Sequence, residues 1–246
     1  MKKSILREGR PRYGVDAPRM GLGILLVSLG IFSAAIFLRQ SRDPGLQALA
    51  HVALSLSPTA LLVILLIISY VTVEKFRHRN RMLDMLSWTG QEQVLDVGTG
   101  KGLLLIGAAK RLTGGKGIGI DIWNRADLSH NSAGAALRNA TIEGVREKVS
   151  IQYADAQCLP FPDHSFDYVV SNLCLHNIPT RNGRDLACRE IDRVLKPGGT
   201  ALIADYIHIG QYLRAFEGCG MTTRRSFSFL VAPLLLFIVR AVKAKA

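Results

Sequence analysis

The sequence of 246 residues predicts an α/β protein in which a doubly wound sheet is preceded by two transmembrane helices. Two long apolar stretches lie in the N-terminal part of the chain, and short β-branched runs then alternate with helical patterns. A glycine-rich turn joins the first of these runs to the helix that follows it. We therefore expect a basic tail at 1–19, a helical hairpin at 20–74 and the α/β domain at 75–246.

The two apolar stretches have the length of membrane spans. Residues 20–38 contain no charged side chain, and residues 49–73 form the second stretch. A helix needs about 20 apolar residues to cross the hydrocarbon core of a bilayer, so both stretches are predicted to span. Pro58 is expected to kink the second helix. A cleaved signal peptide is the alternative for 20–38, but that stretch is long for one and no small-x-small cleavage site ends it.

The net charge of +12 comes from Lys and Arg that flank the apolar stretches, at 1–19, 74–81 and 224–246. The short link between the stretches is poor in these residues, so the positive-inside rule places the N-terminus and residues 75–246 in the cytoplasm. This distribution favours an anionic lipid bilayer over nucleic acid as a partner. None of the four cysteines has the spacing of a metal or redox site, so no metal is predicted.

The sequence VLDVGTGKG is typical of a strand, a tight turn and the start of a helix. Its glycines are Gly98, Gly100 and Gly102, whereas the dinucleotide fingerprint G-x-G-x-x-G would have its third glycine at Leu103. Asp96 comes just before the turn. A carboxylate there would repel a pyrophosphate, but it suits a ligand with an ammonium or sulfonium group, and S-adenosylmethionine (SAM) carries both. A structural turn without a ligand is the alternative.

Polar side chains also follow the next three predicted strands. Residues 117–122 form a strand that carries Asp121 near its end, where a carboxylate can accept the hydroxyls of a ribose. Asp127 competes for this role, but its position fits a helix cap better. Asp155 is placed to accept a hydrogen bond from an adenine amine, or else to cap a turn. His176 follows the fourth strand, as a general base or as a side chain that closes the cofactor pocket.

The other periodic segments complete the predicted domain. The tail 226–239 is ambiguous, because its apolar part is short for a bilayer crossing and contains Pro233. We prefer two paired strands, 222–230 and 234–242, over a membrane contact of this tail. Further strands are predicted at 149–153, 168–171 and 200–205, and helices at 75–89, 126–144, 185–195 and 209–218.

Four ordered motifs in residues 80–242 resemble class I SAM-dependent methyltransferases, in the group that includes ubiquinone and menaquinone methyltransferases. They are VLDVGTGKG, GIGIDI, DAQCLPFPDHSFDYVVSN and EIDRVLKPGGTALIAD. The resemblance implies a Rossmann-like, seven-stranded sheet whose last strand is antiparallel. It implies that the glycine turn holds the methionine end of SAM and that Asp121 binds the ribose. Asp155 and Ala156 would frame the adenine, and Asn172 would line the side of methyl transfer. The predicted cofactor site comprises Asp96, Gly98, Thr99, Gly100, Gly102, Asp121, Ile122, Asp155, Ala156 and Asn172.

We therefore predict a membrane-anchored enzyme that transfers a methyl group from SAM to a small or lipophilic acceptor, with His176 as the candidate base. Asn172 is not followed by the Pro-Pro-Tyr of methyltransferases that act on amino groups of bases or glutamine, so those substrates are disfavoured. Two alternatives stay open at this point. One is a nicotinamide-dependent oxidoreductase on the same kind of sheet, and the other is a non-catalytic module that binds SAM.

Overall fold

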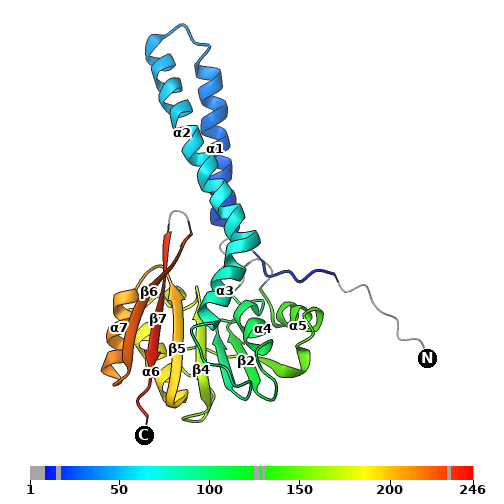
Figure 1. Cartoon of the computed structure of the whole chain (residues 1–246). Coiled ribbons are helices and arrows are strands. Elements are labelled where there is room, and N and C mark those ends of the chain that lie inside the picture. Colours follow the sequence, from blue (N-terminus) through cyan, green and yellow to red (C-terminus); the bar gives the residue numbers. More distant parts are fainter. Residues whose placement is uncertain (1–8, 15–17, 125–127, 129–130, 232–233, 246) are drawn as a thin grey trace, which may run out of the picture.

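The computed structural model describes residues 9–14, 18–124, 128, 131–231 and 234–245. A helical hairpin rises from one side of a three-layer α/β domain (Figure 1). The central sheet has seven strands in the order β3-β2-β1-β4-β5-β7-β6, and β7 runs antiparallel to both of its neighbours. The predicted doubly wound sheet with an antiparallel last strand is confirmed. The strands are β1 (Gln93–Val97), β2 (Lys116–Asp121), β3 (Val149–Tyr153), β4 (Phe166–Asn172), β5 (Leu195–Asp205), β6 (Thr222–Val231) and β7 (Leu234–Val242).

Helices cover both faces of this sheet. On one face, α6 (Arg181–Val194) and α7 (Ile209–Gly218) pack their apolar sides into the larger hydrophobic cluster. On the other face, α3 (Lys75–Leu83) and α4 (Leu103–Ala109) bury theirs in a second cluster. A further helix, α5 (Ala133–Ile142), contacts the edge strand β3. A parallel sheet covered in this way needs strands that are apolar on both sides.

The central strand β1 meets that requirement at three of its buried positions, and Asp96 is the exception among them. Val94 belongs to the cluster under α3 and α4, and Leu95 and Val97 belong to the cluster under α6 and α7. Asp96 lies between them and is only 1% exposed. A carboxyl group in such a place is costly unless local partners stabilise it. We therefore expect Asp96 to have a role other than packing.

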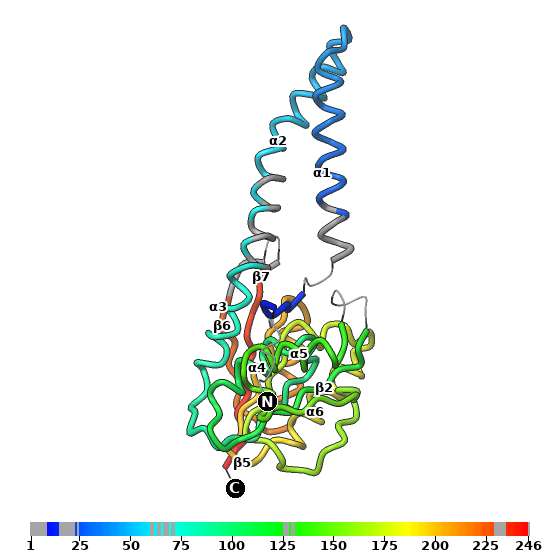
Figure 2. Tube along the Cα trace, turned by 90° about the vertical axis from the view of Figure 1, so that its right-hand side faces the viewer, coloured from blue at the N-terminus to red at the C-terminus, as the bar shows by residue number. Residues whose placement is uncertain are grey.

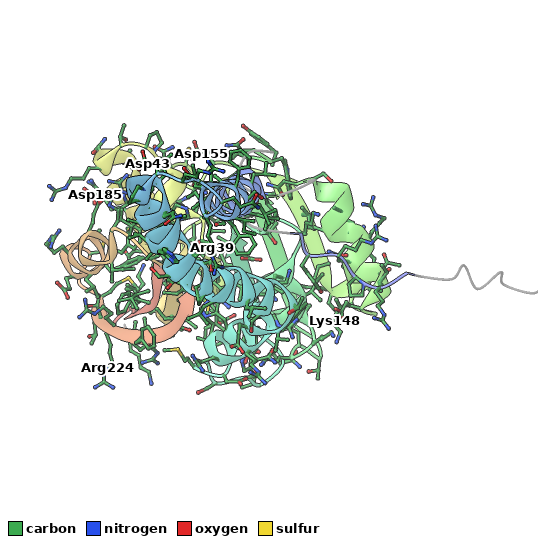
Figure 3. The ribbon with its side chains drawn as sticks, turned by 90° about the horizontal axis from the view of Figure 1, so that it is seen from above. Arg39, Asp43, Lys148, Asp155, Asp185 and Arg224 are labelled. Carbon is green, nitrogen blue, oxygen red and sulfur yellow. The ribbon has the colours of Figure 1, made fainter. Side chains whose placement is uncertain are left out.

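The N-terminal hairpin consists of α1 (Pro18–Leu38) and α2 (Pro44–Ser69). A π-helical turn, Tyr70–Glu74, continues α2 into α3, so one helical rod runs from the hairpin onto the sheet (Figure 2). Viewed along the hairpin, the loop that carries Arg39 and Asp43 projects over the domain (Figure 3).

The two predicted apolar helices are therefore present, but the prediction that they span a membrane is not supported. Among the described residues, no helix is both long enough and apolar enough for a crossing. Several side chains of both helices lie outside the described set. Of the side chains that the structure describes here, Ala35 and Ala50 are fully buried, while Leu26, Leu29 and many other large apolar groups are exposed.

Some predicted boundaries of elements are wrong. The helix expected at 75–89 ends at Leu83, and the helix expected at 126–144 begins only at Ala133. The hydroxyl of Ser132 accepts a hydrogen bond from the backbone N–H of Ala135 at 3.2 Å, which makes Ser132 the cap of that helix. The predicted cap Asp127 lies outside the described residues.

Both ends of the chain contribute more to the domain than an irregular tail would. The paired strands expected in the C-terminal region are confirmed as β6 and β7, with a β-bulge between Phe227 and Phe229. At the other end, Tyr13 is buried against the ring of Phe76, and its hydroxyl donates to Glu143 Oε1 at 2.9 Å. The basic tail predicted at 1–19 is thus partly docked on the domain beside α3 and α5.

Candidate functional site

The turn after β1 has the backbone that its glycines predict. Gly98, Gly100 and Gly102 have φ values of +74°, +53° and +84°, in the left-handed region that side chains other than glycine rarely adopt. At Gly98 there is also no room for a side chain, because a Cβ would lie 2.2 Å from the sulfur of Cys174. The turn therefore brings bare backbone to the carboxyl edge of the sheet, where doubly wound proteins bind their ligands.

Asp96 holds this turn together from inside the sheet. Its Oδ2 accepts hydrogen bonds from the hydroxyl of Thr99 at 2.8 Å and from the backbone N–H of Leu105, in the first turn of α4, at 3.0 Å. Burial nevertheless raises the pKa of Asp96 to about 7. Its Oδ1 makes no hydrogen bond with the described part of the chain, and Asp96 lines a small cavity there. One carboxylate oxygen thus shapes the turn, while the other is available to a ligand.

Asp121 fixes the same turn from the neighbouring strand. Its Oδ2 accepts the N–H of Gly100 at 2.8 Å, and its Oδ1 accepts the N–H of Trp123 at 2.6 Å. The carboxylate is therefore rigid before any ligand arrives. It is only half-buried, so the remaining lone pairs of both oxygens can accept the two hydroxyls of a ribose.

The predicted cofactor residues meet around two adjoining cavities. The larger, of about 190 Å³, is lined by Gly98, Gly100, Asp121, Ile122, Asp155, Ala156 and Asn172. The smaller, of about 60 Å³, is lined by Asp96, Gly98, Thr99, Gly100 and Asn172. Gly102 lines neither and instead is the N-cap residue of α4. Asp155 uses Oδ1 to accept the backbone N–H of Gln157 at 2.9 Å, as the turn-cap alternative expects, and it also faces the larger cavity.

His176 lies beside this site and does not line either cavity, although its neighbours Cys174 and Asn177 do. Its Nδ1 is 2.8 Å from Oδ1 of Asp205, at the end of β5, an ion-pair distance without the alignment of a hydrogen bond. Asp205 is fully buried and also accepts the hydroxyl of Tyr212 at 3.2 Å. A carboxylate on Nδ1 favours the tautomer whose Nε2 is unprotonated, the form that can act as a base.

Sequence reasoning missed four residues that contribute to the site. Lys101 is buried within the glycine turn, and burial together with nearby Arg138 and Arg12 lowers its pKa. Lys75 and Tyr13 line the smaller cavity from α3 and from the N-terminal segment. His78, also on α3, reaches Asn172. Apart from Lys101, these residues are far from the motifs in sequence, so only the folded chain brings them to the site.

The fold and the arrangement of these side chains indicate which class of ligand the site binds. A doubly wound seven-stranded sheet with an antiparallel β7 carries a glycine turn, and the three acids Asp96, Asp121 and Asp155 line the cavities beside it. In a chain of net charge +12, that local acidity fits a cationic nucleoside. The N-terminus of α4 already receives a carboxylate, so it is not available to a pyrophosphate, which is the group that a dinucleotide would bring there.

The comparisons with known proteins agree with this class. Residues 95–203 match the family model described as "Methyltransferase domain". The chain is similar to "Methyltransferase GfsG" of Streptomyces halstedii, with 32% identity over 63% of this chain and 54% of the relative. It is similar to the "Ubiquinone/menaquinone biosynthesis C-methyltransferase UbiE" of Cellvibrio japonicus, with 35% identity over 46% of this chain and 43% of the relative. The chain thus spans about half the length of the curated relatives that it matches.

A solved structure gives the same answer for the fold. The "SAM dependent methyltransferase from Aquifex aeolicus" superposes with a TM-score of 0.57 at 20% identity, over 71% of this chain and 92% of that chain. Taken together, the family match, the relatives and the fold support a SAM-dependent methyltransferase that uses SAM as its cofactor.

Proposed function

We propose that this chain transfers a methyl group from SAM to a small, lipophilic acceptor while its hairpin is attached to a lipid bilayer. The observation that carries the proposal is the acid-braced glycine turn. Asp96 and Asp121 hold the turn from two strands, and it opens onto cavities lined by further acceptor and donor groups. SAM supplies a methyl carbon that its sulfonium has already activated. The protein's main task is then to align the reacting groups.

The donor set fits each end of SAM. Asp96 Oδ1 would accept the ammonium in the smaller cavity, and Lys75, which lines the same cavity, would offset the carboxylate of the methionine end. Asp121 would take the ribose hydroxyls in the larger cavity. Asp155 and Ala156 would frame the adenine there. The fold by itself does not assign these roles. They are proposed from the individual side chains that line the two cavities.

His176 would act as the base for an acceptor whose nucleophilic atom carries a proton. Its Nδ1 is held at Asp205, and no hydrogen bond to Nε2 is formed within the described chain. The side chain of His176 is 15% exposed, so part of the imidazole is accessible. The imidazole can thus take a proton from the acceptor on one side while the carboxylate stabilises the resulting charge on the other.

Equilibrium binding tests the core of this proposal. Titration calorimetry of the full chain in detergent should show binding of SAM, and Asp121→Ala should weaken it by roughly tenfold or more, because the ribose loses a charged acceptor. NADH serves as the competitor that the oxidoreductase alternative requires. Binding of NADH without binding of SAM would reverse the assignment.

Turnover separates an enzyme from a non-catalytic SAM-binding module. Incubation of the chain with membrane extract and SAM labelled in its methyl group should yield labelled product in the organic phase. A chain that binds SAM but labels nothing in extracts of membrane or cytosol would favour the module.

Attachment to lipid is supported by the chemistry of the hairpin. Leu26 is 59% exposed, Phe37 75% and Leu62 55%, and these groups extend along both helices. Large apolar groups exposed along a protruding pair of helices favour an interaction site there. The basic residues that flank the hairpin favour an anionic leaflet on the side of the domain, which fits a cytoplasmic domain and N-terminus.

Flotation with vesicles tests the attachment. The full chain should float with vesicles of phosphatidylcholine and phosphatidylserine, and a variant with Leu26→Glu and Leu62→Glu should remain at the bottom of the gradient. Lys116→Glu, at the exposed start of β2 and outside the basic clusters, serves as a matched control for a simple change of charge. Failure of the unaltered chain to float would remove the bilayer from the proposal and leave the SAM site untouched.

A further inference from the structure

A buried histidine on α3 links three parts of the chain that are far apart in sequence. His78 is 2% exposed. Its Nδ1 lies 2.7 Å from the hydroxyl of Ser228 on β6, and its Nε2 lies 2.8 Å from Oδ1 of Asn172 at the end of β4. Neither bond is needed to build a helix or a strand. The arrangement therefore connects the rod that continues the hairpin directly to the cofactor cavities.

Ser228 reaches His78 because β6 is irregular at that point. Ser228 is the residue between Phe227 and Phe229, where the pairing of β6 with β7 shifts by one residue. Such a bulge turns a side chain out of its regular alternation. The backbone carbonyl of Ser228 accepts a hydrogen bond from the guanidinium of Arg81, one helical turn after His78. The bulge is thus held by two side chains of α3.

These contacts determine which way the amide of Asn172 faces. Burial lowers the pKa of His78 to about 4, so the imidazole is neutral at pH 7 and has one donor and one acceptor nitrogen. Nε2–H donates to Asn172 Oδ1, and Nδ1 accepts the hydroxyl of Ser228. The amide nitrogen of Asn172 makes no hydrogen bond in the described chain, and Asn172 is the one predicted ligand outside the glycine turn that lines both cavities.

We propose that His78 is a positioning residue for the cofactor: through its bond to Oδ1 it directs the NH2 group of Asn172 into the space where the two cavities meet. This rests on the proposed function, since the ligand in that space is taken to be SAM. The amide then donates to a lone pair of the bound ligand and cannot turn away. Without His78, the side chain of Asn172 is free to rotate, and the conformational entropy lost when it is ordered weakens binding of the ligand.

The test uses two substitutions that remove the same ring but keep different nitrogens. In His78→Gln, the amide reaches the place of Nε2 and can still donate to Asn172. In His78→Asn, the shorter amide matches Nδ1 and reaches Ser228 only. We expect His78→Asn to weaken SAM binding roughly tenfold, the effect of one lost hydrogen bond to a buried group, and His78→Gln to stay within about threefold of the unaltered chain. Thermal unfolding of both variants shows whether their stabilities are matched.

A double-mutant cycle decides whether His78 acts through Asn172. In an Asn172→Ala background, His78→Asn and His78→Gln should bind SAM equally well, because the group that they position is gone. Equal binding of the two variants with Asn172 present, or a persisting difference without it, would overturn the proposal. If His78→Asn fails to fold, Ser228→Ala takes its place, with an expected loss of about threefold that also disappears in the Asn172→Ala background. Failure of the unaltered chain to bind SAM would instead count against the proposed function.

Discussion

Two fully buried aspartates lie in the same sheet, and they differ in what they hold. Asp96 of β1 accepts a hydroxyl and a backbone N–H, both from the turn that follows it. Asp205, at the end of β5, accepts bonds from its neighbour's backbone and from Tyr212, and it faces the ring of His176. The first carboxylate shapes the backbone of the candidate cofactor site, and the second faces the imidazole of the candidate base. The two halves therefore differ in whether the buried acid organises a backbone turn or a side chain.

Loss of the imidazole should have the largest effect on turnover. We expect His176→Gln to lower the rate of methyl transfer by about 100-fold or more, the usual contribution of a general base, while the affinity for SAM is unchanged. Asp205→Asn should lower the rate in the same direction, because the tautomer of His176 is then no longer fixed. Rates with labelled SAM and membrane extract measure this. A fall in SAM affinity in either variant would mean that the two halves are not separate.

A side chain at Gly98 should damage the cofactor half alone. Gly98→Ala forces a Cβ against Cys174 as well as a left-handed backbone, and we expect SAM binding to fall roughly tenfold to 100-fold. Gly144→Ala is the matched control, since Gly144 has a φ of +71° but nothing within 4 Å of the added Cβ. Both variants should lose stability, and only Gly98→Ala should lose binding in calorimetry. Similar binding in the two variants would show that the contact with Cys174 has no functional role.

The pH dependence of stability distinguishes Asp96 from an ordinary surface acid. Because burial raises its pKa from 3.8 to about 7, the folded protein favours the protonated carboxyl. The stability that this group contributes is fully present below about pH 4 and is lost as the pH rises through about 7. The Asp96→Asn side chain has nearly the same shape as the aspartate but does not ionise in this pH range. The difference in unfolding free energy between the two proteins should therefore change by at least about 1 kcal/mol between pH 4 and pH 7, in favour of the variant at the higher pH. Denaturant unfolding at several pH values measures it, and a constant difference would contradict the raised pKa.

The smallest effect is expected when one of the three hydrogen-bond donors to Asp205 is removed. Tyr212→Phe removes one hydroxyl from a carboxylate that keeps two backbone N–H donors, from His176 and Tyr206. We expect a loss of about 1 kcal/mol in unfolding free energy and a change of no more than about threefold in the rate of transfer. A large loss of rate with intact stability would assign Tyr212 a direct part in orienting the acid.

The two halves also differ in how far the sequence predicts them. The glycine turn of the cofactor half is local, because Asp96, the turn and α4 lie within a short segment, and their geometry follows from turn chemistry and strand order. The pairing of His176 with Asp205 joins residues 29 apart across two strands, and the contact of His78 with Ser228 joins residues 150 apart. No periodicity carries such information. The helix end at Leu83 was missed because Met85, Leu86 and Trp88 continue the apolar pattern into a segment that packs on the second cluster.

The position of the last strand has a consequence for biosynthesis. β7 lies between β5 and β6, although it follows both in the chain. While the polypeptide is being made, β5 keeps an open row of backbone donors and acceptors until residues 234–242 have left the ribosome. Exposed strand edges of this kind pair with other chains, so the nascent protein passes through an interval in which it is prone to aggregation.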